Sequence, residues 1–227
     1  MSRGDARPLV VIGCRETAQR AHDVFTIDLG RRVIAFSAEP EFLDTHELCG
    51  LPVVPFDKLP ERFPPSKFDV FVAVGSGGMN AGRKRLCEAC RDMGYALASC
   101  VSPRACVGHH VALGDNAFIM DGAVIGDGSS LGDGVTVWNG AQVSHLAKVG
   151  DYAWIAPAAS FGGEVSVGDR AFIGVNATVL PGVHVGRMAL VGAGCVLTHD
   201  AAVGGVYAGV PGRLIRRQEF EEAEHLG

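Results

Sequence analysis

Apolar residues recur every six positions through the C-terminal half of the chain, from Val101 to Val203, without an insertion. Each hexad opens with an aliphatic or aromatic residue, and a small or β-branched residue follows four positions later. An α-helix would need apolar residues at a period of about 3.6 and would be destabilised by so many glycines. Two inward positions in every six are instead typical of a parallel β-helix built from hexapeptides. The pattern therefore predicts this fold for the second half of the chain.

The first hundred residues follow another pattern, in which short apolar runs alternate with segments of helical spacing. Strands are predicted at residues 9–13, 32–36, 51–55 and 68–74, the third of them a proline-flanked edge strand, and helices at 15–29 and 82–93. This alternation predicts a small, Rossmann-like α/β domain with a parallel sheet. Such sheets bind ligands at the carboxyl ends of their strands, here at residues 13–17, 37–39 and 75–80.

The two patterns divide the chain into an α/β domain at residues 1–99, a β-helix at 100–212, and a short polar helix at 213–227. Unpaired strand edges at the open ends of a β-helix invite association. We therefore expect the α/β domain to cover one end and the C-terminal helix to cover the other. The unbroken run of hexads leaves no long loop, so a site has to be built on the outer faces, between subunits.

Composition narrows the choice of partners and compartment. The formal net charge of −5 at pH 7 argues against nucleic acid or an anionic membrane as a partner. No run reaches the about 20 apolar residues that a membrane span requires. The seven cysteines have no framework spacing and are expected to be reduced thiols of a cytoplasmic protein. Cys87 and Cys90 form a lone CxxC motif in a predicted helix, for which structural thiols are favoured over zinc ligands.

Candidate chemistry lies at one corner of the predicted coils. Three hexads make one triangular coil, so residues eighteen apart stack directly, about 4.8 Å apart. One corner column contains His109, Asp127, His145, Gly163, Pro181 and His199. A histidine between a carboxylate and a bare backbone N–H has the parts of an acyl-transfer site, and His145 lies between Asp127 and Gly163 in this way. An inert surface histidine is the alternative interpretation.

The same column raises the question of zinc, because His109 and His145 are thirty-six residues apart, or two coils. β-Helix carbonic anhydrases bind zinc with that spacing and a third histidine five residues after the second. Here this position is Gly150, and zinc catalysis requires three protein ligands and a water. No metal site is therefore expected, although a zinc hydratase stays as a distant alternative.

Motifs beyond the bare repeat carry a resemblance to a known family. They lie at residues 73–75, 101–105, 145–157, 161–163 and 208–212, and the last of them reads Ala-Gly-Val-Pro-Gly. Through these motifs almost the whole chain resembles the sugar O-/N-acyltransferases, left-handed β-helix proteins that include bacterial nucleotide-amino-sugar N-acetyltransferases and sialic acid O-acetyltransferase-like proteins. The resemblance implies a homotrimer that binds acetyl-CoA between adjacent β-helices. It also implies a nucleotide-linked amino sugar as the acceptor, in polysaccharide or glycan synthesis.

The resemblance assigns a role to individual residues. His145 matches the catalytic base, and Gly163 matches the residue whose N–H meets the thioester oxygen. Contacts to CoA are implied at Trp154, Gly163, Val175 and Ala193, and contacts to the acceptor nucleotide at Gly13, Ser37 and Gly75. Arg15 stands where the family has a glycine-rich turn, and its side chain is expected to pair with phosphate.

One departure from the family concerns the base itself. The family has an acidic residue directly after the catalytic histidine, whereas this chain has Leu146. Asp127, and Glu164 one coil above Leu146, are the candidates to replace that acidic residue. The leading prediction is an acetyl-CoA-dependent N-acetyltransferase acting on a nucleotide-linked amino sugar. Two alternatives stay open, namely a sugar O-acetyltransferase and a binding or scaffold protein that retains the β-helix without catalysis.

Overall fold

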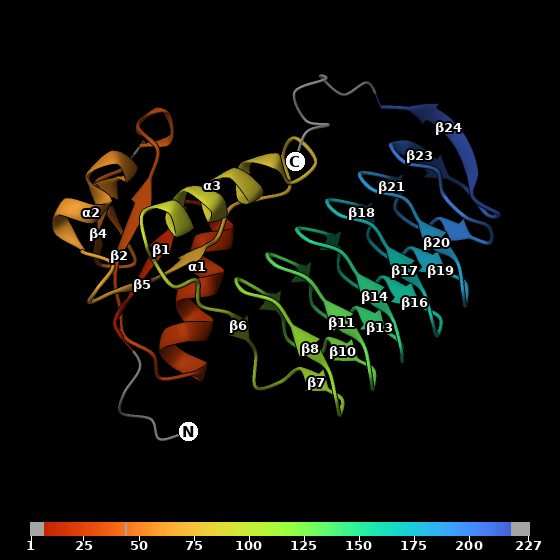
Figure 1. The fold of residues 1–227 in the computed structure, drawn as a ribbon, viewed down its shortest axis with the longest axis horizontal. Coiled ribbons are helices and arrows are strands. Elements are labelled where there is room, and N and C mark those ends of the chain that lie inside the picture. Colours follow the sequence, from red (N-terminus) through yellow and green to blue (C-terminus); the bar gives the residue numbers. More distant parts are fainter. Residues whose placement is uncertain (1–6, 44, 219–227) are drawn as a thin grey trace.

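The computed structural model describes residues 7–43 and 45–218 of the chain, in two domains that lie side by side (Figure 1). The N-terminal α/β domain contains every α-helix of the described residues, and the β-helix extends away from it (Figure 1). This architecture is the one predicted from the two hydrophobic patterns.

The α/β domain is built on one sheet with the strand order β3-β4-β2-β1-β5, parallel except for β3. Its strands are β1 (Leu9–Ile12), β2 (Val33–Ala38), β3 (Glu47–Leu48), β4 (Leu51–Pro55) and β5 (Asp69–Val72). Its helices are α1 (Glu16–Asp23), continued by a π-helical turn at Val24–Asp28, α2 (Leu59–Arg62) and α3 (Ala81–Asp92), with 3-10 turns at Pro40–Phe42 and Phe56–Lys58. The prediction that β4 is an edge strand was wrong, because β3 pairs with its free side.

The β-helix consists of three sheets of short strands. The domain-facing sheet contains β6 (Cys100–Val101), β9 (Phe118–Ile119), β12 (Thr136–Val137), β15 (Trp154–Ile155), β18 (Phe172–Ile173), β21 (Leu190–Val191), β23 (Gly205–Ala208) and β24 (Arg213–Arg217). The second sheet contains β7 (Cys106–Val107), β10 (Val124–Ile125), β13 (Gln142–Val143), β16 (Ser160–Phe161), β19 (Thr178–Val179) and β22 (Val196–Leu197). The third contains β8 (Ala112–Leu113), β11 (Ser130–Leu131), β14 (Lys148–Val149), β17 (Ser166–Val167) and β20 (His184–Val185). Thr136 pairs with Trp154, which confirms the predicted stacking at intervals of eighteen residues.

The corners of the coils depend on left-handed backbone. Every sixth residue from His110 to Gly194 has a positive φ, between 55° and 72°. Such a conformation costs an L-residue roughly 1–2 kcal/mol, and glycine or asparagine is its usual occupant. Leu146, Glu164 and Arg170 nevertheless occupy corners of this kind. The buried aliphatic core inside the coils holds these corners in place.

Two expectations about the ends of the β-helix were wrong. The α/β domain lies along the domain-facing sheet and does not cover the open end of the first coil, where Val107 keeps 38% of its surface exposed. Residues 213–217 form β24 and not a helix, because this segment pairs antiparallel with β23 and so covers an otherwise unpaired edge. The remainder of the predicted helix, residues 219–227, lies outside the described residues.

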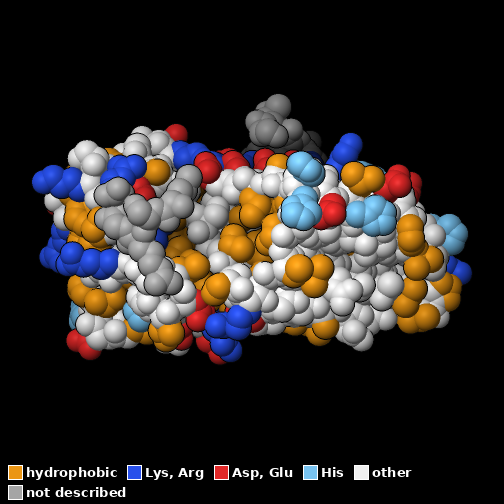
Figure 2. All heavy atoms as spheres, turned by 90° about the horizontal axis from the view of Figure 1, so that it is seen from below, with side chains coloured by type: hydrophobic (Ala, Val, Ile, Leu, Met, Phe, Trp, Pro, Cys, Tyr) orange, Lys and Arg blue, Asp and Glu red, His pale blue; other side chains and the backbone are white. Residues whose placement is uncertain are grey.

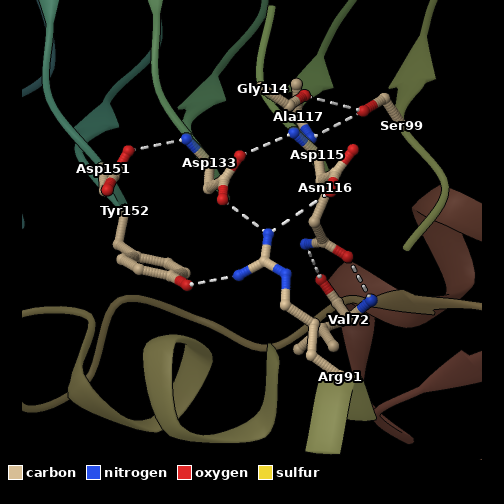
Figure 3. Close-up of polar contacts among 10 residues, drawn as sticks. All are labelled: Val72, Arg91, Ser99, Gly114, Asp115, Asn116, Ala117, Asp133, Asp151 and Tyr152. Atoms are coloured by element: carbon tan, nitrogen blue, oxygen red, sulfur yellow. Dashed lines mark hydrogen bonds and ion pairs between the residues drawn. The ribbon is translucent and has the colours of Figure 1, made fainter. Parts of the chain in front are cut away.

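Helix α3 holds the two domains together along the corner between the third and the domain-facing sheets. The buried side chain of Arg83 donates hydrogen bonds of 2.9 Å to the carbonyls of Gly134 and Tyr152. Figure 3 shows Arg91, further along α3, between Asp133 and the hydroxyl of Tyr152. Side chains of α3 therefore join the two domains by donating hydrogen bonds to the β-helix.

Candidate active site

A cavity of about 390 Å³ opens at the carboxyl ends of β1, β2 and β5, where the sequence predicted a ligand site. Gly13, Arg15 and Gly75 line this cavity, as expected. Ser37 lies beneath it: its carbonyl accepts a 2.7 Å hydrogen bond from the N–H of Gly13, and its hydroxyl is buried without a partner among the described residues. The structure therefore brings three of the four predicted acceptor residues to the cavity surface and places the fourth behind them.

Gly13 is required by both conformation and space. Its φ of +130° is rarely adopted by an L-residue, and a Cβ there would lie 2.5 Å from the carbonyl oxygen of Ala73. We expect Gly13→Ala to lower the free energy of unfolding by about 3 kcal/mol, from backbone strain and overpacking together. Urea denaturation measures this loss. Gly82→Ala is the control, because a Cβ at that position meets nothing within 4 Å.

The cavity also contains residues that the sequence did not single out as binding residues. Arg85 donates two hydrogen bonds of 2.7 Å to the carboxylate of Glu39, and these bonds lower the pKa of Glu39. Phe42, which is 48% exposed, lines the same cavity. An apolar wall, an exposed ring and the two arginines Arg15 and Arg85 suit a ligand with a flat group and negative charge. The sequence signal that could have indicated Glu39 as a binding residue was its position directly after a strand end.

A second group of residues lies at the corner between the second and third sheets. A Cβ on Gly163 would lie 2.5 Å from both Cε1 and Nε2 of His145, so the imidazole covers this glycine closely. The register agrees, because the N–H of Glu164 donates to the carbonyl of His145 at 3.0 Å. Figure 2 shows histidine side chains gathered along an edge of the β-helix beside an acidic side chain. The structure thus brings together His145 and Gly163, which the sequence placed in one column.

The backbone N–H of Gly163 is available to a ligand. Elsewhere in the coils an aspartate Oδ1 accepts the N–H of the residue eighteen positions earlier, as Asp133 does for Asp115 at 2.8 Å (Figure 3). The residue eighteen positions after Gly163 is Pro181, which has no acceptor side chain. Among residues 7–43 and 45–218, the N–H of Gly163 has no hydrogen-bond partner. A free N–H beside an imidazole is the arrangement that stabilises an oxyanion next to a base.

Asp127 has a structural partner. Its Oδ1 accepts the N–H of His109 at 2.7 Å, in the same way as the aspartates of the neighbouring corner. Asp127 follows Gly126, so it belongs to a Gly-Asp turn of the coils and has a structural role there. Its role in orienting His145 stays a prediction.

The partner of Asp127 leads to a test of that role. In Asp127→Asn the amide oxygen can still accept the N–H of His109, so we expect kcat within about threefold of the wild type and an unchanged pH–rate profile. Steady-state kinetics between pH 6 and about 9 measure both quantities. A displaced profile, with kcat reduced more than about tenfold, would show that the negative charge acts on His145.

The chain is similar in sequence and in structure to known proteins. Residues 110–145 match the bacterial transferase hexapeptide (six repeats), and residues 164–199 match the hexapeptide repeat of succinyl-transferase. No curated protein sequence matches the chain. A solved structure of PerB from Caulobacter crescentus, in complex with CoA and GDP-perosamine, shares 32% identity over 91% of this chain and 96% of its own, with a TM-score of 0.83. This chain belongs to the hexapeptide-repeat sugar acyltransferases.

Two further solved structures extend the comparison. The acetyltransferase domain of PglB from Neisseria gonorrhoeae, in complex with acetyl coenzyme A, is 27% identical over 93% of this chain and all of its own, with a TM-score of 0.84. WeeI from Acinetobacter baumannii is 17% identical over 91% of this chain and 99% of its own, with a TM-score of 0.66, and shows the likeness of the fold alone. The similarity covers the α/β domain as well as the β-helix.

The four residues expected to contact CoA in this acyltransferase lie in three different places, and one of them, Gly163, is beside His145. Trp154 is only 9% exposed in the domain-facing sheet, with Trp138 and Phe172 beside its ring and Arg83 over it at 5.2 Å. Its surroundings are those of an interdomain packing residue, and its contact with CoA stays a prediction. Val175 and Ala193 are exposed and stack at the corner between the domain-facing and second sheets.

Three further properties of the acyltransferase concern a metal site, a reactive CxxC motif and a membrane span. In the described part of the chain, no group of three or more histidine, cysteine, aspartate or glutamate side chains is placed to hold a metal ion. Burial raises the pKa of Cys87 and of Cys90 to about 12, so both thiols stay protonated at neutral pH. No helix of the described residues combines the length and the apolar character that a membrane span requires.

Proposed function

We propose that this protein is an acetyl-CoA-dependent N-acetyltransferase that acetylates the amino group of a nucleotide-linked amino sugar. The observation that carries the proposal is the contact between the imidazole of His145 and Gly163, whose N–H is free among the described residues. The relative at 32% identity, crystallised with CoA and GDP-perosamine, supports both substrates. A reducing compartment is supported by the seven cysteines, none of which forms a disulfide in the described part of the chain, and we assign the enzyme to the cytoplasm.

The proposed reaction is a direct attack on the thioester. The sugar amine attacks the thioester carbonyl carbon while His145 takes a proton from the nitrogen. The carbonyl oxygen becomes negative and accepts the N–H of Gly163, which lies beside the imidazole. The C–S bond then breaks, the amide forms, and the CoA thiolate takes up the proton that the imidazolium releases.

The acceptor sugar nucleotide is assigned to the cavity of the α/β domain. Arg15 and Arg85 would face its diphosphate, and Phe42 offers a ring against which a base can stack. The coils are triangular, and His145 lies at the corner opposite the sheet on which the α/β domain is packed. His145 and the cavity of the same chain are therefore on different sides of the β-helix, so a neighbouring chain is needed to complete the site.

We therefore propose a homotrimer in which the cavity of one chain faces His145 of the next. CoA would run in the groove between two β-helices, along Val175 and Ala193 of one of them. Light scattering tests this assembly, and a monomer in solution would exclude it.

The activity itself is tested by release of free thiol from acetyl-CoA with GDP-, UDP- and dTDP-linked amino sugars. We expect turnover with at least one of them, and a product heavier by one acetyl group. Resistance of that product to hydroxylamine distinguishes an amide from an ester, and so decides between N- and O-transfer. Binding of acetyl-CoA without turnover on any acceptor would favour the scaffold alternative.

A further inference from the structure

A left-handed turn at residues 78–80 connects two segments whose residues line the acceptor cavity. Gly78, Met79 and Asn80 have φ values of +59°, +50° and +64° in succession. Gly75 and Gly77 before this turn line the cavity, and so do Gly82, Arg85 and Leu86 after it, at the start of α3. The path of the turn therefore sets the position of residues on two sides of the cavity.

The turn is held from the β-helix by one side chain, that of Arg170. Its Nε donates to the carbonyl of Met79 at 3.0 Å, and its Nη2 donates to the carbonyl of Gly78 at 3.2 Å. In return, Nδ2 of Asn80 donates to the carbonyl of Arg170 at 3.3 Å. Arg170 and Asn80 are both buried, so water does not compete for these bonds.

The residues that form these hydrogen bonds have left-handed backbone conformations. Arg170 itself occupies a left-handed corner, with φ of +57°, where glycine or asparagine would fit with less strain. Met79 and Asn80 are likewise non-glycine residues in left-handed conformations. Backbone strain of this kind persists only where the surroundings over-determine it, and it collects at ligand sites. Here the strained turn joins two segments that line the cavity, and the group that holds it comes from the domain that carries His145.

We infer that Arg170 is a positioning residue for the acceptor. It fixes the turn at residues 78–80, and through the turn it fixes the distance across the cavity between Gly75 and Arg85. The inference rests on the proposed function for the identity of the ligand. It assigns to the β-helix a second task besides acetyl transfer, namely holding the shape of the acceptor cavity of its own chain.

The test is a comparison of Michaelis constants in Arg170→Asn, Arg170→Lys and the wild type. Asparagine suits the left-handed corner and removes the guanidinium, whereas lysine retains one donor. We expect Arg170→Asn to raise KM for the nucleotide amino sugar about tenfold, with KM for acetyl-CoA within about twofold of the wild type. Arg170→Lys should lie between the two. Equal changes in both Michaelis constants, or no change in either, would overturn the inference.

Arg104→Asn is the matched control, because Arg104 also joins the two domains but contacts Asp28 and Asp121, away from the cavity. We expect it to leave both Michaelis constants unchanged. Amide hydrogen exchange without any ligand adds a readout that is independent of the reaction. Exchange over residues 75–82 should be at least about tenfold faster in Arg170→Asn than in the wild type or in Arg104→Asn. Unchanged exchange would overturn the positioning role even if the proposed function holds, whereas a wild type that binds no nucleotide sugar would refute the proposed function.

Discussion

Replacing His145 by alanine is expected to lower kcat for acetyl transfer by about 10²–10⁴-fold, the usual contribution of a positioned general base. The imidazole lies against Gly163 at an exposed corner, and the three atoms nearest to a Cβ on that glycine all belong to the ring of His145. The amine would then have to lose its proton to water during attack on the thioester. Thiol release from acetyl-CoA at saturating acceptor measures the loss.

His199→Ala is the matched control for this prediction. His199 belongs to the same corner column and is exposed, but its ring is hydrogen-bonded to the hydroxyl of Thr198. We expect kcat within about twofold of the wild type in this variant. Binding of CoA, followed by calorimetry, should be retained in both variants, because a general base contributes to the transition state and not to ground-state binding. Full activity in His145→Ala would remove the site from this corner.

The second large effect is expected from Gly163→Ala. The added methyl carbon would lie 2.5 Å from both Cε1 and Nε2 of His145, so the imidazole has to move. Displacement of a base by about 1 Å can reduce the rate about 100-fold. Alanine keeps the backbone N–H that serves as the oxyanion donor, so the effect comes from the displaced ring. We therefore expect kcat to fall by at least about 100-fold, with little change in the melting temperature, because the ring is at the surface and can rotate away.

A double-mutant cycle separates this effect from a general disturbance of the coil. In the His145→Ala background no ring is left for the methyl group to displace. Gly163→Ala should therefore cost much less there than in the wild type, so that the two changes are strongly non-additive. Additive effects would mean that the alanine acts on the N–H of Gly163 or on the coil, and not through His145.

How far each feature could be predicted depended on whether its partners are related by the repeat. His145 and Gly163 are eighteen residues apart, one coil, so the period alone placed them in contact. The strand ends of the α/β domain were predictable for a similar reason, because alternating strands and helices lead the carboxyl ends of parallel strands to one edge. These predictions required only local pattern and a fixed geometry.

Contacts between non-repeating segments were not predictable in this way. Glu39 and Arg85 are 46 residues apart, and Arg170 lies 91 residues from Met79, with no period that relates either pair. The burial of Trp154 depends on which sheet the α/β domain covers, and the residue itself looks the same in sequence whether it faces solvent, CoA or a domain. The choice of strand at residues 213–217 depended on the open edge of β23, a partner supplied by the fold.

The hydrophobic period by itself therefore determined the β-helix, its stacking at intervals of eighteen residues and the pairing of His145 with Gly163, because in a repeating coil separation along the chain is equivalent to separation in space. Only the tertiary structure decided where the α/β domain lies. That placement buried Trp154, and set Arg170 against the strained turn of the acceptor cavity. It also put His145 at the corner opposite the α/β domain, since packing between two domains depends on the shapes of both surfaces and not on any local period.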